Sequence, residues 1–308
     1  MIQIFFKTLP FFALIGLGYW ACRTRFFTEE AAAYLTKFVF YFALSAMLFR
    51  FAASLPISEV FDAQFAYAYL AGCFTIYFLF TAVALFRGIG IEEAAIEAQC
   101  SVIGNVGFLG VPMLVVLLGE AAAGPVLLVL AIDLIVFSSL IVILITGSRD
   151  GRMSFGMLRT VGLGLLKNPM IVSISLGLIC SGLSLPIPAP VDEFLSILGA
   201  AATPGALFAI GASLAGKSAE RLSVASWLSF GKLVLHPIAV AFFALMVFDV
   251  DRFSASVMIS AAALPVAGNV YILAQHYGVA PQRVSASILI STAISVLTVS
   301  LVIAVLQG

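Results

Sequence analysis

Residues 99–120 read QCSVIGNVGFLGVPMLVVLLGE, and this stretch decides the fold expected for the whole chain. It is apolar enough to lie in a bilayer, yet its middle holds five residues that disturb a helix: Gly104, Asn105, Gly107, Gly110 and Pro112. Glycine loosens a helix, and proline has no backbone N–H to donate. Because lipid offers no hydrogen-bond partner, a broken helix is expected only inside protein or beside a watery cavity.

A second stretch of the same kind occurs far downstream, at residues 261–278, AAALPVAGNVYILAQHYG. Pro265, Gly268 and Asn269 interrupt it. Two interrupted helices in corresponding halves of a membrane protein are typical of the substrate site of a secondary transporter.

The composition restricts the class of protein. The chain has 308 residues, 63% of them hydrophobic and 10% charged, with a mean hydropathy of +1.18. This composition predicts a polytopic α-helical membrane protein. The net charge is zero without a polybasic run, so no nucleic-acid partner is expected. The four cysteines match no metal or disulfide spacing, and no nucleotide-binding motif is present, so neither a metal site nor a cofactor is predicted.

Ten segments approach the ~20 apolar residues that span a bilayer. They are Ile2–Cys22, Thr36–Ala53, Phe65–Phe86, Ala98–Leu118, Val126–Thr146, Pro169–Leu185, Phe194–Ala215, Ser223–Phe248, Ala255–Tyr277 and Ser285–Leu306. The longest connection, residues 147–168, is basic and is expected to be partly helical.

Lys and Arg are distributed unevenly between the two sides of this predicted topology. The loops after segments one, three, five, seven and nine carry eleven, and the opposite side carries three. The eleven are Arg23, Arg25, Lys37, Arg87, Arg149, Arg152, Arg159, Lys167, Lys217, Arg221 and Arg283; the three are Lys7, Arg50 and Arg252. Since positive loops stay in the cytoplasm, both termini are predicted to lie on the non-cytoplasmic side of the inner membrane.

The chain also shows a long-period repeat. A shift of 159 residues places Pro10 on Pro169, Gly18 on Gly177 and Phe49 on Phe208, and it brings the two interrupted stretches together. Five helices per half is an odd number, so the second half would enter the membrane from the opposite face. The predicted organisation is therefore a five-helix repeat at 1–146, a cytoplasmic connection at 147–168 and an inverted five-helix repeat at 169–308.

Four stretches carry a resemblance to a known family: LPFFALIGLGYWACR at 9–23, FYFALSAMLF at 40–49, NVGFLGVPM at 105–113 and ALPVAGNVYILAQHYG at 263–278. The chain resembles the auxin efflux carrier family, whose bacterial members are commonly described as malonate or malate permeases. The resemblance implies ten helices in two inverted repeats. It also implies broken helices four and nine that cross near the midplane, as in the bile-acid transporter-like fold, and carriage of organic anions.

The chain departs from the family pattern in two places. Ser45 stands in the second helix where family members often have proline, although Pro204, its partner in the repeat, is present. Neither interrupted stretch carries an acidic residue near the crossing, whereas sodium-coupled relatives in the wider fold group do. The resemblance therefore gives no support for sodium coupling.

The interrupted stretches supply the candidate substrate-binding residues. Amides at Asn105 and Asn269 lie beside unwound backbone, and the N-terminal ends of half-helices favour a carboxylate. The alternative is that glycine and asparagine only allow close helix packing. The predicted set is Ser101, Asn105, Gly107, Gly110, Pro112, Pro265, Gly268, Asn269 and Tyr271.

Charged residues elsewhere are candidates for coupling. Asp133 lies deep in the fifth segment, where an acid either cycles a proton or serves as a structural hydrogen-bonded group. His236 and Lys232 lie four apart on one helix face and could attract an anion or pair with Asp133. Lys232 is expected instead to extend to the cytoplasmic interface, and Glu97 to belong to a solvated helix start.

The sequence thus predicts a secondary carrier for small organic anions, carboxylates such as malonate, malate or auxin-like acids, with a proton as the candidate coupling ion. Two alternatives stay open: an uncoupled channel or uniporter of the same fold, and a membrane-embedded enzyme. The second has little support, because no paired aspartates, serine with a base, or zinc motif is present. Expected partners are the anion and the lipid bilayer, and the sequence allows a homodimer.

Overall fold

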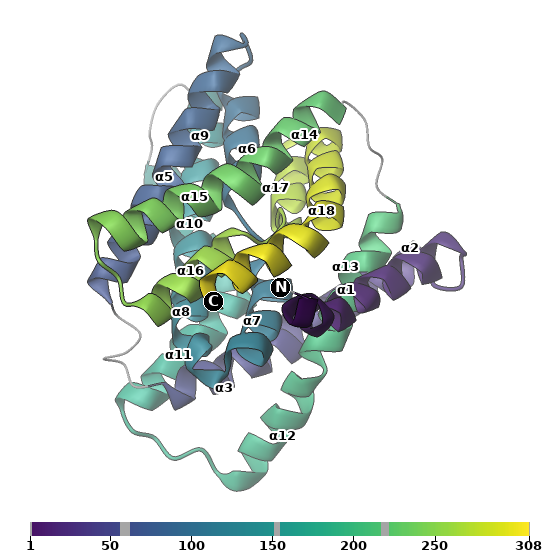
Figure 1. Cartoon of the computed structure of the whole chain (residues 1–308), viewed down its shortest axis with the longest axis vertical. Coiled ribbons are helices and arrows are strands. Elements are labelled where there is room, and N and C mark those ends of the chain that lie inside the picture. The colour runs from purple at the N-terminus through teal and green to yellow at the C-terminus, as the bar shows by residue number, and fades with distance from the viewer. Residues whose placement is uncertain (1, 56–61, 151–154, 217–221, 308) are drawn as a thin grey trace.

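A computed structural model describes residues 2–55, 62–150, 155–216 and 222–307, and these residues are organised almost entirely as helices (Figure 1). Three of the loop cations counted above, Arg152, Lys217 and Arg221, lie outside the described residues. The first half begins with α1 (Ile2–Arg23), then α2 (Glu29–Phe38), a π-helical turn η1 (Val39–Ala43), α3 (Leu44–Ser54) and α5 (Ala63–Phe86).

The second span begins at Glu29, earlier than the predicted Thr36. Thr28 caps it, because its hydroxyl accepts the N–H of Ala31 at 3.1 Å, and two glutamates occupy the first turn. Carboxylates near a helix N-terminus are favoured by the helix dipole. Hydropathy alone misses such a start, because the capping turn is polar.

The two interrupted stretches are divided into short helices. The first comprises α6 (Ile91–Val102), the π-turn η2 (Val106–Gly110) and α7 (Val111–Leu118). The second comprises α16 (Arg252–Ala262) and α17 (Gly268–Tyr277). After α7 the chain continues through η3 (Glu120–Ala122), α8 (Ala123–Ile132), the π-turn η4 (Asp133–Phe137) and α9 (Ser138–Asp150).

The rest of the chain completes the second half. The connection contains α10 (Phe155–Lys167), as predicted, and a 73° bend joins it to α11 (Pro169–Gly182). The following elements are α12 (Ala189–Ala200), α13 (Ala202–Ala215), α14 (Leu222–Phe230), η5 (Gly231–Leu235), α15 (His236–Phe242), η6 (Phe243–Val247) and α18 (Pro281–Gln307).

Seven helices of the described chain are long and apolar enough to cross a membrane, or eight if the bent pair α10–α11 counts as one span. These eight correspond to predicted segments one, two, three, five, six, seven, eight and ten. The remaining two predicted segments, Ala98–Leu118 and Ala255–Tyr277, are the interrupted ones, and their breaks leave each half too short to qualify.

Close glycine contacts join helices of the two halves, and two of them correspond under the repeat. Helix α1 packs on α13, where a Cβ on Gly18 would lie 2.1 Å from the carbonyl oxygen of Phe208. Helix α3 packs on α11, where a Cβ on Gly177 would lie 2.6 Å from the carbonyl oxygen of Phe49. The shift of 159 residues that places Gly18 on Gly177 also places Phe49 on Phe208, so the two contacts correspond.

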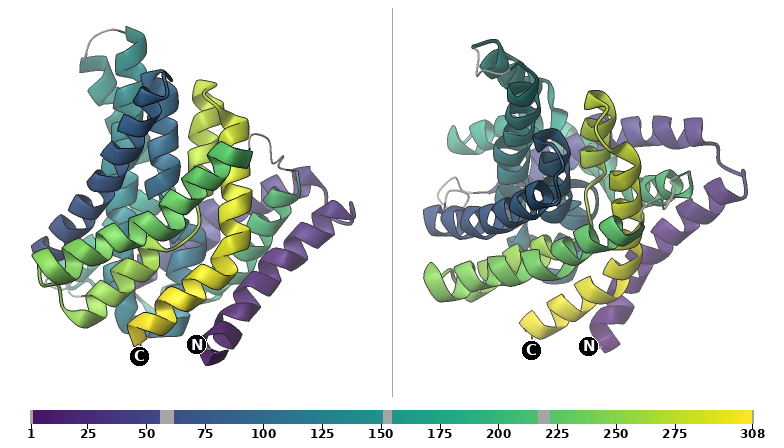
Figure 2. Two further views of the ribbon diagram at one scale, coloured as in Figure 1. Left: turned by 45° about the horizontal axis from the view of Figure 1, so that its top comes forward. Right: turned by 90° about the horizontal axis from the view of Figure 1, so that it is seen from above.

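The two termini lie together. Thr8 in α1 and Ser300 in α18 share a buried hydrogen bond of 2.7 Å. Figure 2 shows the N and C ends side by side at one end of the molecule, with the end of α9 and the start of α10 at the opposite end.

Candidate functional site

The two interruptions meet each other. Gly104 and Val266 form an isolated antiparallel bridge, in which the N–H of Asn105 donates to the carbonyl of Pro265 at 2.8 Å. The N–H of Ala267 donates to the carbonyl of Ile103 at 3.0 Å. The backbone groups that the breaks release are therefore satisfied by the partner break. Since Pro265 and Val266 are fully buried, the prediction that these breaks lie inside protein is confirmed.

Each break is followed by a helix start with free donors. The carbonyl of Asn105 accepts from the N–H of Leu109 at 3.1 Å and of Gly110 at 2.9 Å, which begins the helical run Val106–Leu118. At the other break α17 begins at Gly268 without a side-chain cap. The N–H of Val270 donates to the carbonyl of Ala267 at 3.3 Å, whereas the N–H groups of Gly268 and Asn269 make no backbone hydrogen bond among the described residues. Unpaired N–H groups and the dipole favour an anion at such an end.

The two asparagines retain unused hydrogen-bonding capacity. The side-chain amide of Asn105, 8% exposed, makes no hydrogen bond to another described residue. Asn269 is half-buried, and its Oδ1 is buried without a hydrogen-bond partner among the residues that the structure describes. A buried amide oxygen without a partner is costly, so both amides are suited to receive a ligand or ordered water.

The glycines of the first break pack closely on neighbouring side chains. A Cβ on Gly107 would lie 2.7 Å from Cε of Met170, and one on Gly110 would lie 2.6 Å from Cδ1 of Leu264. Pro112 is buried in the first turn of α7. These three residues shape the crossing by close packing, whereas Gly268 at the start of α17 is exposed.

The two hydroxyl candidates already have partners. Ser101 is fully buried, and its hydroxyl donates to the carbonyl of Glu97 at 3.0 Å within α6. The hydroxyl of Tyr271 accepts from Nε2 of Gln275 at 2.9 Å along α17. Both hydroxyls therefore make hydrogen bonds within their own helices.

Lys232 does not extend to the cytoplasmic interface, and that expectation is wrong. Its side chain is fully buried in η5, and its ammonium donates to the carbonyl of Ala262, the last residue of α16. It also lies 3.1 Å from Nδ1 of His236, as the spacing of four residues predicted. The ammonium thereby caps the carbonyl end of a broken helix, where a cation is favoured by the dipole.

The two coupling candidates lie in the same buried region. Asp133 is 3% exposed at the start of η4, and Oδ1 accepts the hydroxyl of Tyr69 at 2.9 Å. The other oxygen, Oδ2, is buried without a hydrogen-bond partner among the described residues. The ring of His236 lies 6.2 Å from that of Tyr69, and Nε2 is 3.2 Å from Sγ of Cys73. Hydropathy and spacing gave no indication of Tyr69 or Cys73.

Glu97 is likewise not part of a solvated helix start. It is 1% exposed and is held by Arg87 at 2.7 Å and by Arg283 at 2.5 Å, while Arg283 also reaches Glu93 at 3.1 Å. This network joins α6 to α18. The expectation is wrong because α6 begins at Ile91, so that Glu97 lies inside the helix, beyond its acidic first turn of Glu92 and Glu93.

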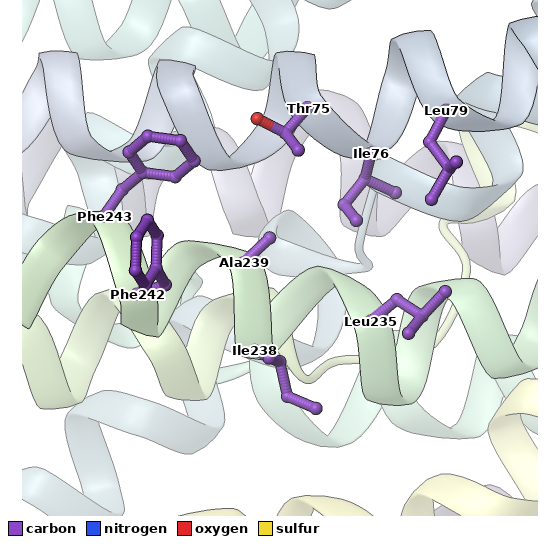
Figure 3. Close-up of a pocket in the computed structure, with 8 residues that line it drawn as sticks. All are labelled: Thr75, Ile76, Leu79, Leu235, Ile238, Ala239, Phe242 and Phe243. Carbon is purple, nitrogen blue, oxygen red and sulfur yellow. The ribbon is translucent and has the colours of Figure 1, made fainter.

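An apolar groove of about 400 Å³ lies between α5 and the η5–α15–η6 helix (Figure 3). Its lining side chains are Thr75, Ile76, Leu79, Leu235, Ile238, Ala239, Phe242 and Phe243. The hydroxyl of Thr75 is bonded to its own helix, and Ile238 is 60% exposed. The groove therefore offers an anion no donor, and the crossing is the better candidate site.

Apolar helices crossing the membrane several times, with two broken helices paired at a buried crossing, define a multi-pass membrane transport protein. The family described as membrane transport protein matches residues 3–303, and the chain belongs to it, the auxin efflux carrier family. The chain is 31% identical over 306 residues to "Putative malonate transporter" of Rhizobium meliloti (strain 1021), covering 97% of this chain and 95% of the relative.

A second relative is more distant. "Uncharacterized transporter YfdV" of Escherichia coli (strain K12) is 26% identical over 292 residues, covering 92% of this chain and 91% of the relative. Both relatives are matched along nearly their whole length. The family and the relatives are transporters, and this chain is a transporter rather than an enzyme.

Proposed function

We propose that this chain is a secondary transporter that moves small organic anions by alternating access, with the carboxylate held at the crossing of the two broken helices. The observation that carries the proposal is the pairing of the breaks around Gly104 and Val266, with the amides of Asn105 and Asn269 left unused beside it. Amide donors and free helix N-termini recognise a carboxylate without a metal ion.

Carboxylates such as malonate, malate or auxin-like acids are the proposed substrate class. The name of the Rhizobium relative supports malonate as the first probe. The apolar groove of Figure 3 lacks the polar groups that a dicarboxylate requires, which supports the crossing in preference to it.

The proposed architecture is ten spans in two inverted five-helix repeats, at 1–146 and 169–308, joined by a cytoplasmic connection at 147–168. Its support is the correspondence of the Gly18–Phe208 and Gly177–Phe49 contacts. Helix boundaries follow the same shift, since α7 ends at Leu118 and α17 at Tyr277. The distribution of Lys and Arg supports termini outside the cytoplasm of an inner-membrane protein.

Proton coupling is the proposed source of energy, with Asp133 and His236 as the coupling residues. The orphan oxygen of Asp133 supports this role, because an O–H on Oδ2 is the simplest change that a buried carboxyl can make. The competing function is an uncoupled uniporter of the same fold.

Purified protein in liposomes separates the two functions. With a pH gradient imposed and labelled malonate equal on both sides, the proton-coupled carrier accumulates malonate above its external concentration, and a protonophore abolishes the accumulation. A uniporter only equilibrates it. Failure to move or bind malonate, malate or indole-3-acetate under any gradient would overturn the substrate class.

A further inference from the structure

A buried cation without a paired carboxylate lies next to the crossing. The ammonium of Lys232 contacts the carbonyl of Ala262 and Nδ1 of His236, and Nδ1 is itself 3.2 Å from that carbonyl. When Lys232 is an ammonium it donates to both, and this state corresponds to the tautomer of His236 that carries its proton on Nε2. His236 is then neutral and supplies no balancing charge.

No acidic oxygen lies within 4.0 Å of Lys232 in the part of the chain that the structure describes. Burying an unpaired ammonium is costly, so its charge must be balanced from slightly farther away. Asp133 belongs to the same buried cluster: Oδ1 accepts the hydroxyl of Tyr69 at 2.9 Å, and the ring of Tyr69 lies 6.2 Å from that of His236, which contacts Lys232 at 3.1 Å. The hydrogen bond that Asp133 accepts comes from the hydroxyl of Tyr69 rather than from Lys232.

The ammonium also lies beside the first break, next to Gly104. A Cβ on Gly104 would lie 3.2 Å from Nζ of Lys232 and 3.3 Å from the carbonyl oxygen of Ala261. Gly104 is the residue of the first break that pairs with Val266, and Asn105 follows it directly. Lys232 therefore lies between the two breaks, close enough for its field to act on an anion held by Asn105.

We infer that Lys232 links proton uptake to anion binding: the Asp133 carboxylate balances its ammonium in the empty transporter, and the substrate carboxylate balances it once Asp133 is protonated. This inference rests on the proposed anion site at the crossing. A proton from the side of the membrane to which the transporter is open bonds to Oδ2 of Asp133. The Asp133–Lys232 pair thereby loses one negative charge, and binding of the substrate anion restores it. Anion and proton then travel together, and no metal cation is required.

Other titratable groups around the pair do not replace Asp133. Tyr69 and Cys73 face it from α5, and His236 faces it from α15. Tyrosine and cysteine are ordinarily protonated at neutral pH, and His236 accepts from Lys232. Of the elements packed on α8, α3 carries Arg50, which is paired with Asp192, and η3 carries the exposed Glu120. Of those packed on η5, α6 and α18 carry Glu97 and Arg283, which are paired with each other.

The test measures malonate binding by purified protein between pH 5.5 and 8, together with the proton uptake that accompanies binding in weak buffer. The expected parent behaviour is an affinity that falls by up to about tenfold per pH unit as pH rises, with close to one proton taken up per malonate. Asp133→Asn, which imitates the protonated acid, should bind malonate with an affinity independent of pH and without proton uptake.

Lys232→Met should lower malonate affinity by at least tenfold and remove its pH dependence, whereas Lys232→Arg, which keeps the charge, should retain both. Lys167→Met, an exposed lysine at the end of α10, is the matched control and should behave as the parent. Melting temperature reports folding for every variant, and parent-like binding by any Lys232 variant lacking the charge overturns the inference.

The outcomes separate this inference from the function it rests on. If the parent binds no carboxylate at any pH, the proposed function fails and this inference fails with it. If the parent binds malonate without proton uptake, or Asp133→Asn keeps the parent's pH dependence, only the link through Lys232 and Asp133 fails.

Discussion

Asn105 and Asn269 differ from Ser101 and Tyr271, the hydroxyl candidates near the crossing, because their side-chain amides have hydrogen-bonding capacity left. The hydroxyl of Ser101 is used within α6, and that of Tyr271 is bonded to Gln275. The two amides are therefore available to form hydrogen bonds with a ligand at the crossing. This difference separates a binding role for the asparagines from a packing role.

Asn105→Ala and Asn269→Ala should each weaken malonate binding by roughly tenfold to a hundredfold. A hydrogen bond to a charged group contributes about 1.5–3 kcal/mol, and each 1.4 kcal/mol is about a factor of ten in affinity. Ser101→Ala is the control and should bind with near-parent affinity, because its hydroxyl serves its own helix. Affinity and melting temperature are measured on the same samples, and unchanged affinity in both asparagine variants refutes the site.

Some features of single residues could be predicted from the sequence, and others could not. The pattern of glycine, asparagine and proline located both breaks, and the spacing of Lys232 and His236 predicted their contact. The burial of Lys232 could not be read from the sequence, because its partner is a backbone carbonyl made available by a break thirty residues later. Glu97 was misread for a similar reason: one of its partners, Arg283, is 186 residues away.

At the scale of helices, close glycine contacts set the separation of elements from the two halves. Helices α1 and α13 approach at Gly18 and again at Gly211, where a Cβ would lie 1.8 Å from the carbonyl oxygen of Ile15. Small residues allow such backbone approach in membrane proteins, where packing replaces the hydrophobic effect between helices. The neighbouring Gly16 faces open space, with nothing within 4 Å of its Cβ position.

Gly18→Ala should destabilise the protein by about 1–3 kcal/mol, because the obstructing atom is a backbone oxygen that cannot move alone. Gly177→Ala should cost a similar amount, since it meets the carbonyl of Phe49 in the corresponding contact. Gly16→Ala, in the same helix as Gly18, should be neutral or stabilising by up to about 1 kcal/mol. Unfolding titrations in mixed detergent micelles measure all three, and equal stability of Gly18→Ala and Gly16→Ala contradicts the close contact.

The order of helices was largely predictable, whereas their ends and internal irregularities were not. Hydropathy located all the uninterrupted spans, but it missed the start of α2, which depends on the Thr28 cap. It also gave no sign of the π-turns that contain Asp133 and Lys232. Such turns follow from tertiary packing and side-chain hydrogen bonds rather than from periodicity, and they are frequent at functional sites.

At the scale of the whole molecule, the termini and the connection between the halves lie at opposite ends (Figure 2). This arrangement is the one expected if each half crosses the membrane an odd number of times, as the proposed inverted repeats do. The excess of Lys and Arg supports the proposal that the connection is cytoplasmic, because positive loops are retained there.

Two single cysteines test this orientation in a background without Cys22, Cys73, Cys100 and Cys180. A cysteine at Gln307, near the C-terminus, should react with a membrane-impermeant maleimide added to intact cells, whereas one at Arg159 in α10 should react only after the membrane is opened. The reverse pattern would keep the fold and overturn the cytoplasmic assignment of the connection. Labelling of both positions from one side would remove the inverted repeat itself, because an even number of crossings cannot turn the second half over.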